Sequence, residues 1–355
     1  MRNSTMTSSR FIDAVSLAST QSPNPDGKTL YITEYFQTLE VLSYAWPAIV
    51  LFGFIANITN IVVFLKAGVK DNVTILLISL SCSDLSFLAL ISPSVCGYII
   101  EGLVRPSPWP FHKYLLMHSL YWPAFTAYDL SAFISVSLGV MRCACVAMPL
   151  KFKLVFTKSR TIKWVFFLVV LVVLLRLPVL TIFRITWRTD PTTNVSALHL
   201  ANVNKASMSR INDILNRGFV IWINNVTMVT CVIVLSYNLY RASKMRQSCA
   251  SFKGPQPSDQ ASAAQGMSSK DLQVVKSVVL VCTIFIMSQL PFLLLSTTRL
   301  TNRNLDESKG LHFLFVILSQ INRTCAYINA SINIFVYYNY NSKYRCVLRS
   351  ILCDK

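Results

Sequence analysis

The chain alternates between long apolar runs and short polar connections, and the apolar runs have the length of membrane-spanning helices. A bilayer crossing needs about 20 mostly apolar residues, because every backbone amide in the hydrocarbon must be satisfied within its own helix. The runs that meet this length are residues 43–66, 73–100, 114–145, 162–184, 218–241, 272–298 and 311–338. The pattern therefore predicts an all-α fold, a seven-transmembrane helix bundle that occupies residues 43–341.

Two of these segments, 114–145 and 311–338, carry more polar residues than the others. Polar side chains within a span are expected to face neighbouring helices rather than lipid. The composition agrees with a membrane protein, since 53% of the residues are hydrophobic and only 14% are charged. Such a composition argues against a water-soluble fold.

The segments outside the bundle differ in character. Residues 1–42 contain no apolar run of signal-peptide length, which predicts an uncleaved N-terminal segment. Residues 242–271 are rich in Ser, Gln, Ala, Gly and Pro, as is typical of a disordered loop. Residues 342–355 combine basic and apolar side chains, which predicts a short amphipathic helix on membrane lipids followed by a short tail. Cys353 is there a candidate for palmitoylation, with a free thiol as the alternative.

The distribution of Lys and Arg along the chain predicts how the chain is oriented in the membrane. The connections that include 146–161, 242–271 and the C-terminal tail hold the larger excess of Lys and Arg over acidic residues, so we expect them to be cytoplasmic. The N-terminus is then extracellular and the C-terminus cytoplasmic, as in a multi-pass protein of the cell membrane. Asn3 and Asn194 lie in glycosylation triplets on the outer side.

The net charge of +18 does not indicate nucleic-acid binding, because the basic residues flank membrane segments and form no nucleic-acid module. The predicted outer loops contain no cysteine, so we expect no disulfide between them.

Polar residues at bilayer depth are costly, at least about 2.5–3.5 kcal/mol for a charged group, so each is a functional hypothesis. The deep acids are Asp84 and Asp129. Neutral polar residues that can join Asp84 at the bundle centre are Asn57, Ser131, Asn329 and Asn333. Together they predict either a site for an allosteric sodium ion or a polar cluster that holds the helices together.

The motifs, in their order along the chain, resemble those of rhodopsin-like G-protein-coupled receptors. The resemblance covers residues 43–353 and rests on several short patterns. They are Asn57 in the first span, Leu80-Ser81-Cys82-Ser83-Asp84-Leu85 in the second, Met141-Arg142-Cys143 with Pro149 after the third, Phe285 with Pro291-Phe292 in the sixth, Asn333-Ile334-Phe335-Val336-Tyr337 in the seventh, and Tyr344-Arg345 after it.

The chain departs from the family pattern at several positions. Met141 replaces the acid beside the arginine, Ile334 replaces a proline, and Gln289 stands where a tryptophan is usual. Met117 replaces the family's cysteine in the third span, and its partner cysteine in the second outer loop is absent as well. This divergence resembles an invertebrate branch, similar to molluscan chemosensory receptors and FMRFamide-type peptide receptors.

The resemblance implies a conformational switch and a heterotrimeric G protein as the partner. In the family, the arginine that corresponds to Arg142 is held by acids in the inactive state, and here Asp271 matches the acid of the sixth helix. Activation opens a cytoplasmic gap for a heterotrimeric G protein. The residues that would take part are Arg142, Asp271, Tyr237, Tyr337, Asn333, Phe285 and Pro291. The alternative for Arg142 is an interfacial anchor.

The resemblance also implies that an extracellular small molecule or peptide binds in the outer half of the bundle. Candidate contact residues are Arg323, Tyr327, Tyr128, Asp129 and Gln289. Arg323 could instead pair internally or reach the lipid headgroups. An amine ligand is not indicated, because Ala124 stands where amine receptors have an aspartate.

Other function classes fit less well. A transporter or channel needs a polar path across the membrane, and the few buried charges are too scattered to outline one. Catalysis has no support either, because the four histidines show no metal-ligand spacing. A receptor without a cofactor is therefore the prediction, with a seven-helix transporter or channel as the alternative.

Overall fold

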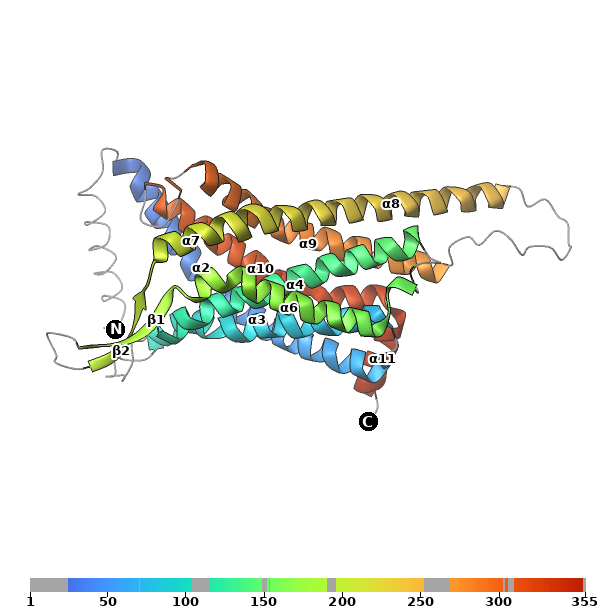
Figure 1. Ribbon diagram of the computed structural model, residues 1–355, viewed down its shortest axis with the longest axis horizontal. Helices are drawn as coiled ribbons and strands as arrows, with labels where there is room; N and C mark the ends of the chain where they lie inside the picture. The colour runs from blue at the N-terminus through green and yellow to red at the C-terminus, as the bar shows by residue number, and fades with distance from the viewer. Residues whose placement is uncertain are drawn as a thin grey trace, which may run out of the picture.

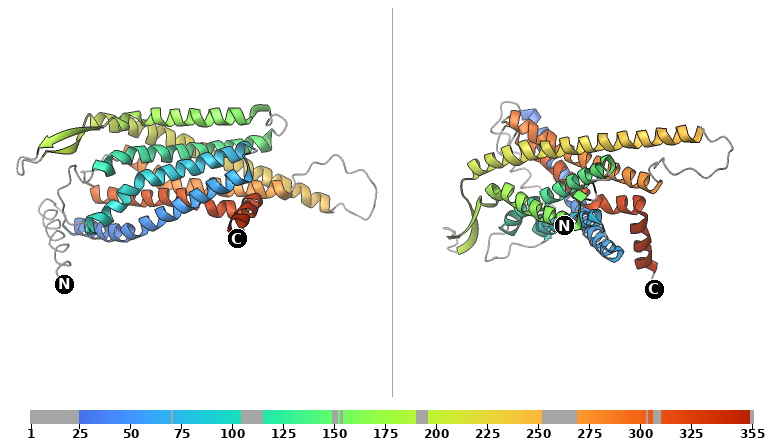
Figure 2. Two further views of the ribbon diagram at one scale, coloured as in Figure 1. Left: turned by 90° about the horizontal axis from the view of Figure 1, so that it is seen from below. Right: turned by 45° about the vertical axis from the view of Figure 1, so that its right-hand side comes forward.

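The computed structural model describes residues 25–69, 71–103, 115–148, 152, 154–189, 196–251, 269–302, 304–305 and 310–353. These residues form a bundle of long helices with a β-hairpin at one end and a short crosswise helix at the other (Figures 1 and 2). We call these the hairpin end and the α11 end. The elements in order are α2 (Pro25–Ala67), α3 (Asn72–Leu103), α4 (Leu115–Ala147), α6 (Lys158–Leu180), β1 (Phe183–Thr189), β2 (Ser196–Asn202), α7 (Lys205–Asn212), η1 (Asp213–Val220), α8 (Ile221–Ser251), α9 (Ser269–Thr301), α10 (His312–Tyr340) and α11 (Ser342–Cys353).

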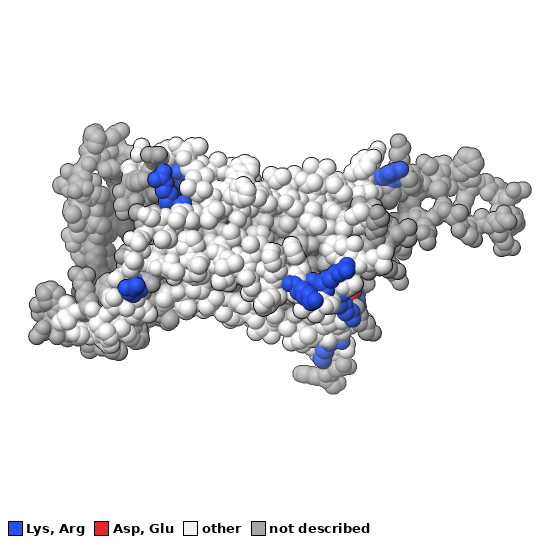
Figure 3. Space-filling model, viewed as in Figure 1, with Lys and Arg blue, Asp and Glu red and all other residues white. Residues whose placement is uncertain are grey.

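Six segments of the described chain are long and apolar enough to cross a membrane. They are Tyr44–Ala67, Asn72–Cys96, Ser119–Cys145, Lys158–Leu180, Ser207–Asn238 and Cys282–Thr301. Helix α10 corresponds to the predicted span 311–338 but is more polar, and its buried residues include Gln320, Asn329 and Ser331. A polar helix can lie in a membrane when its polar side chains face other helices. On the face shown in Figure 3, Lys and Arg gather at the two ends and leave an uncharged belt between them.

The six candidate spans overlap the predicted apolar runs, and several helices extend beyond those runs. Helix α2 begins at Pro25 rather than at residue 43, so a helix continues into the segment 1–42. Helix α8 continues to Ser251 and α9 begins at Ser269, so both enter the predicted disordered loop 242–271. Residues 252–268 of that loop lie outside the described residues. At the α11 end, α8 runs well beyond its neighbours (Figure 1).

The predicted span 218–241 is the middle of a longer composite helix. It begins with α7 at Lys205, passes through the π-helix η1 and continues as α8. A π-helix places its hydrogen bonds one residue further along than an α-helix and is often found at functional sites. The apolar pattern did not indicate η1, since a change of helical pitch leaves no clear trace in hydropathy.

The connection between α6 and α7 is a β-hairpin, which the sequence pattern did not predict. Its strands are antiparallel, with Ile185 opposite Leu200 and Trp187 opposite Leu198. Side chains alternate across a strand, so these apolar residues share one face of the hairpin. Residues 190–195 between the strands lie outside the described residues.

The buried apolar residues form three clusters along the bundle. Towards the hairpin end, Trp46, Phe87 and Tyr327 belong to a cluster that joins α2, α3, α4 and α10. Towards the α11 end, Phe64 and Tyr337 belong to a second cluster, which includes α11. The third cluster joins α4, α8 and α9 and contains Ala132, Met228, Leu235, Cys282 and Phe285.

Helix α11 is attached to the bundle through Tyr344. The hydroxyl of Tyr344 donates a hydrogen bond of 2.7 Å to Asn60 Oδ1 in α2. Burial raises the pKa of the Tyr344 hydroxyl to about 12, so it stays protonated and keeps this role as donor. Figure 2 shows α11 turned away from the bundle axis, as predicted for a membrane-surface helix.

Candidate functional site

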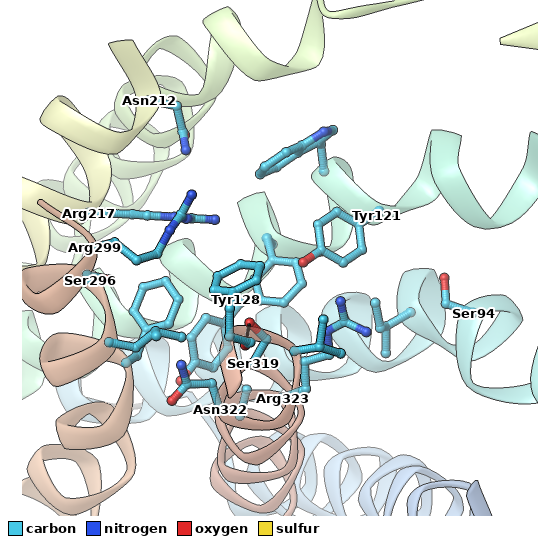
Figure 4. Close-up of a pocket in the computed structure, with 18 of the residues that line it drawn as sticks. Ser94, Tyr121, Tyr128, Asn212, Arg217, Ser296, Arg299, Ser319, Asn322 and Arg323 are labelled. Atoms are coloured by element: carbon cyan, nitrogen blue, oxygen red, sulfur yellow. Dashed lines mark hydrogen bonds between the residues drawn. The ribbon is translucent and has the colours of Figure 1, made fainter. Parts of the chain in front are cut away.

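A cavity of about 450 Å³ opens among the helices near the hairpin end. Its walls come from α2, α3, α4, α6, α7, η1, α9 and α10 (Figure 4). The aromatic lining residues are Trp46, Tyr121, Trp122, Phe125, Tyr128, Phe292, Phe315 and Tyr327. The charged lining residues of the described chain are Arg176, Arg217, Arg299, Arg323 and Asp213. A concave, aromatic site with a few converging polar groups is the usual form of a small-molecule site.

Three of the predicted ligand residues, Arg323, Tyr327 and Tyr128, line this cavity. Arg323 lies 5.5 Å from the centre of the Tyr121 ring and donates a hydrogen bond of 3.3 Å to Gln320. This guanidinium therefore lies at the cavity wall and has contacts within the bundle.

The other two predicted ligand residues, Asp129 and Gln289, line a smaller space of about 20 Å³ that also touches Tyr128. Gln289 Nε2 donates a hydrogen bond of 2.7 Å to the Tyr128 hydroxyl, which links α9 to α4. Among the predicted ligand residues, Tyr128 is thus the one that borders both spaces.

Asp129 forms a buried ion pair with Arg176 of α6, with side chains 21% and 5% exposed. Arg176 also donates a hydrogen bond of 3.1 Å to Asn212 Oδ1. Asn216 donates to Asn212 Oδ1 at 3.0 Å and to the Leu175 carbonyl at 2.9 Å. This network joins α4, α6, α7 and η1, and it satisfies Arg176 through Asp129 and Asn212. The sequence marked Arg176 and Asp129 as buried charges but did not pair them.

A second charged group, which the sequence analysis missed, lies on η1 and α9. Asp213 accepts from Arg217 at 3.2 Å through Oδ1 and lies 3.6 Å from Arg299 Nη2 through Oδ2. Figure 4 shows Arg217 and Arg299 next to each other on one side of the cavity. Asp213 and Arg217 are four residues apart, a spacing that could have indicated their contact. They precede the predicted start of the span at 218, so they were assigned to an outer loop.

Midway along the bundle, Asp84 has no exposed surface and is held by two of its predicted neighbours. Ser131 Oγ donates to Asp84 Oδ1 at 2.5 Å, and Asn333 Nδ2 donates to Oδ2 at 2.9 Å. Asn57 instead donates to the carbonyls of Gly53 and Ala330. Asn329 is buried, but no hydrogen bond joins it to Asp84 in the described chain.

Towards the α11 end, Arg142 of α4 lies beside Met141, which is buried. The Nε atom of Arg142 is buried without a hydrogen-bond partner among the described residues. Asp71, just before α3, is close enough to act on Arg142 electrostatically. The side chain of the predicted partner, Asp271, lies outside the described residues.

The other predicted switch residues occupy different surroundings. Phe285 is buried against α4 and α8, and Tyr337 is buried against Phe64 and Tyr344. Tyr237, in contrast, is 63% exposed on α8. Pro291 lies within α9. Of the predicted modification sites, Cys353 is exposed in α11, and Asn3 and Asn194 lie outside the described residues.

Cys96 and Cys325, the two cysteines nearest the hairpin end, are both free thiols, and the same holds for the other cysteines that the structure describes.

A family model described as serpentine type 7TM GPCR chemoreceptor Srw matches residues 44–355. No curated protein matches the chain. The family accounts for the multi-pass membrane bundle and for a receptor that works with a ligand and a G protein rather than as an enzyme. Because the match covers the whole bundle, the chain belongs to the Srw family of serpentine seven-transmembrane G-protein-coupled chemoreceptors.

Proposed function

We propose that this chemoreceptor binds an extracellular small molecule or peptide in the cavity near the hairpin end and activates a heterotrimeric G protein at the α11 end. The observation that carries the proposal is the cavity of about 450 Å³, whose aromatic and arginine-bearing walls come from helices that continue to Arg142 and Tyr337. A ligand that prefers one arrangement of these helices shifts the whole bundle towards that arrangement.

The proposal includes an orientation with the hairpin end outside the cell. It is supported by the excess of Lys and Arg in the connections at the α11 end. Residues 1–42 are then extracellular, residues 342–355 are cytoplasmic, and Asn3 and Asn194 are available for glycosylation. Cys353, exposed on α11, is a palmitoylation site in this arrangement.

The proposed switch uses Arg142 as the contact with the G protein. In the inactive state Arg142 is held near acidic groups, with Asp271 as its partner. On activation α9 pivots at Pro291, Phe285 repacks, and Tyr237 and Tyr337 turn towards the opened gap. Support comes from the buried Nε of Arg142, which has no partner in the described chain and can gain one in another state.

The proposal also assigns a sodium response to the group around Asp84. Asp84 supplies a charged oxygen, Ser131 and the carboxamides of Asn329 and Asn333 supply neutral ones, and Asn57 Oδ1 is a buried oxygen without a hydrogen-bond partner among the described residues. Hard cations prefer such oxygen ligands. Asp84→Asn should abolish the effect of sodium on G-protein activation, with choline chloride as the ionic-strength control. An unchanged sodium effect in this variant would contradict the assignment.

Within this class, the proposed relatives are molluscan chemosensory receptors and invertebrate FMRFamide-type peptide receptors, which the pattern Asn57-Ile58-Thr59-Asn60-Ile61 resembles. The cavity volume fits a small molecule or the end of a peptide. A panel that contains small organic compounds and short peptides separates the two.

The experiment that tests the proposed function is guanine-nucleotide exchange in membranes that contain the chain and a G protein. A ligand from the panel should accelerate exchange in the unmodified chain and have no effect in Arg142→Ala. If a compound is instead carried across the membrane, or evokes a current, without nucleotide exchange, the chain functions as a transporter or channel.

A further inference from the structure

We infer that the ligand is an organic anion with an aromatic or aliphatic body, and that its acid group binds between Arg217 of η1 and Arg299 of α9. This inference rests on the proposed function, because it concerns the ligand of the same cavity. It adds the chemical class of that ligand and the residues that recognise its charge.

The first support is the balance of charge at the cavity. Four arginines and one aspartate are among its described lining residues. The charge of Arg176 is balanced by Asp129, which lines the smaller space rather than this cavity. Of the other lining arginines, Arg217 and Arg299 share the carboxylate of Asp213. A cavity whose charged lining is mostly of one sign attracts ligands of the opposite sign.

The second support is the geometry around Asp213. Its two carboxylate oxygens face Arg217 at 3.2 Å and Arg299 at 3.6 Å, so one carboxylate is shared by two guanidinium groups. The arrangement shows that a carboxylate fits between these arginines. Arg217 and Arg299 are 21% and 14% exposed, so both are mostly removed from water yet reach the cavity. A guanidinium binds carboxylates in a planar, directional way.

The third support concerns the remainder of the ligand. Arg299 lies over the Phe315 ring at 4.9 Å from its centre, which keeps the guanidinium at the wall. Tyr121 lies across the cavity from the arginine pair in Figure 4, and Tyr128 lies between them in that view. Aromatic rings next to a charged subsite favour an acid with an apolar body over an inorganic ion. A cationic ligand would lie against Arg217 and Arg299, where repulsion opposes binding.

The test uses the purified full-length chain in detergent and a panel of arylalkanoic acids, each with its matched amide and its matched amine. Affinity is measured as the concentration-dependent rise of the thermal unfolding midpoint. At least one acid should bind roughly tenfold or more tightly than its amide, and its amine should give no stabilisation. If no acid stabilises the chain, or if the amines bind best, the inference is overturned.

Variants locate the acid group. Arg217→Gln and Arg299→Gln should each weaken the acid by roughly tenfold or more and leave the amide unchanged. Arg210→Gln is the matched control, because Arg210 is exposed on α7 and does not line the cavity. Asp213→Asn should strengthen acid binding, since it removes the internal carboxylate that occupies the arginine pair. Equal losses for acid and amide in Arg217→Gln, or weaker acid binding in folded Asp213→Asn, would contradict the assignment.

Nucleotide exchange with the same panel separates this inference from the proposed function. Acids that bind through Arg217 but never change exchange would refute the proposed function and leave the ligand class intact. Exchange driven by amines or amides, with the acids inert, would refute the ligand class and leave the proposed function intact.

Discussion

Two buried arginines, Arg176 in the hairpin half and Arg142 in the α11 half, have contrasting surroundings. In the hairpin half, Arg176 is fixed by an ion pair with Asp129 and a hydrogen bond to Asn212, next to an open cavity. In the α11 half, Arg142 lies in a packed region, and its buried Nε has no partner among the described residues. A buried charge whose partners are all present stabilises the helix packing that holds them together. A buried group that lacks a hydrogen-bond partner can gain one when the helices move. The hairpin half is thus suited to hold a ligand and the α11 half to change state.

The largest expected effect tests whether the Asp129–Arg176 pair fixes the hairpin half. Asp129→Asn leaves the buried Arg176 without its counter-charge, which should lower the free energy of unfolding by about 3 kcal/mol. The measurement is thermal unfolding of the purified chain in detergent. The double variant Asp129→Asn/Arg176→Gln should recover most of the loss, because no buried charge remains unpaired. Equal unfolding temperatures for the unmodified chain and Asp129→Asn would show that the pair does not fix this half.

The next effect concerns the charge of Arg142 in the α11 half. In the proposed switch Asp271 is the acid that holds Arg142, because Met141 replaces the second acid of the family pattern. Removing the remaining acid by Asp271→Ala should raise ligand-free nucleotide exchange by up to about tenfold, which corresponds to about 1.4 kcal/mol. Met141→Glu should lower it.

Asp71 provides the alternative partner for Arg142, since it acts on this guanidinium electrostatically. If Asp71→Asn raises ligand-free exchange at matched expression while Asp271→Ala does not, the restraint comes from the connection before α3. That result would contradict the assigned role of Asp271.

The smallest expected effect concerns the hydrogen bond that attaches α11 to the α11 half of the bundle. Tyr344→Phe removes the hydrogen bond to Asn60 and leaves a buried carboxamide oxygen unsatisfied, which should cost about 1 kcal/mol in unfolding free energy. Tyr338→Phe is the matched control, since Tyr338 is exposed. A loss in the control as large as in Tyr344→Phe would show that the effect does not come from the bond to Asn60.

The helical layout could be predicted from the sequence because each span needs an apolar run of a fixed length. The hydrogen bonds of Asp84 to Ser131 and Asn333 were also within reach, since few residues can satisfy a carboxylate at bilayer depth. The sequence analysis identified these residues because a polar group at bilayer depth is costly and therefore needs a partner.

The cavity wall was harder to predict. The pairing of Asp129 with Arg176 depends on how α4 and α6 pack, which hydropathy does not specify. Asp213 and Arg217 reach the cavity because η1 continues the helix beyond the apolar run. The β-hairpin was not predicted because its strands are short and lie between membrane spans. The long apolar runs of those spans dominate the hydropathy pattern.

We propose that a ligand acts in the hairpin half and that the signal leaves from the α11 half. The most direct measurement is nucleotide exchange, with and without an activating ligand, in two variants at matched expression. Ala326→Trp fills the cavity at a buried lining position and should abolish the ligand response while leaving ligand-free exchange unchanged. Arg142→Ala should abolish exchange altogether while the ligand still stabilises the purified chain. A full ligand response in Ala326→Trp, or normal exchange in Arg142→Ala, would contradict the account.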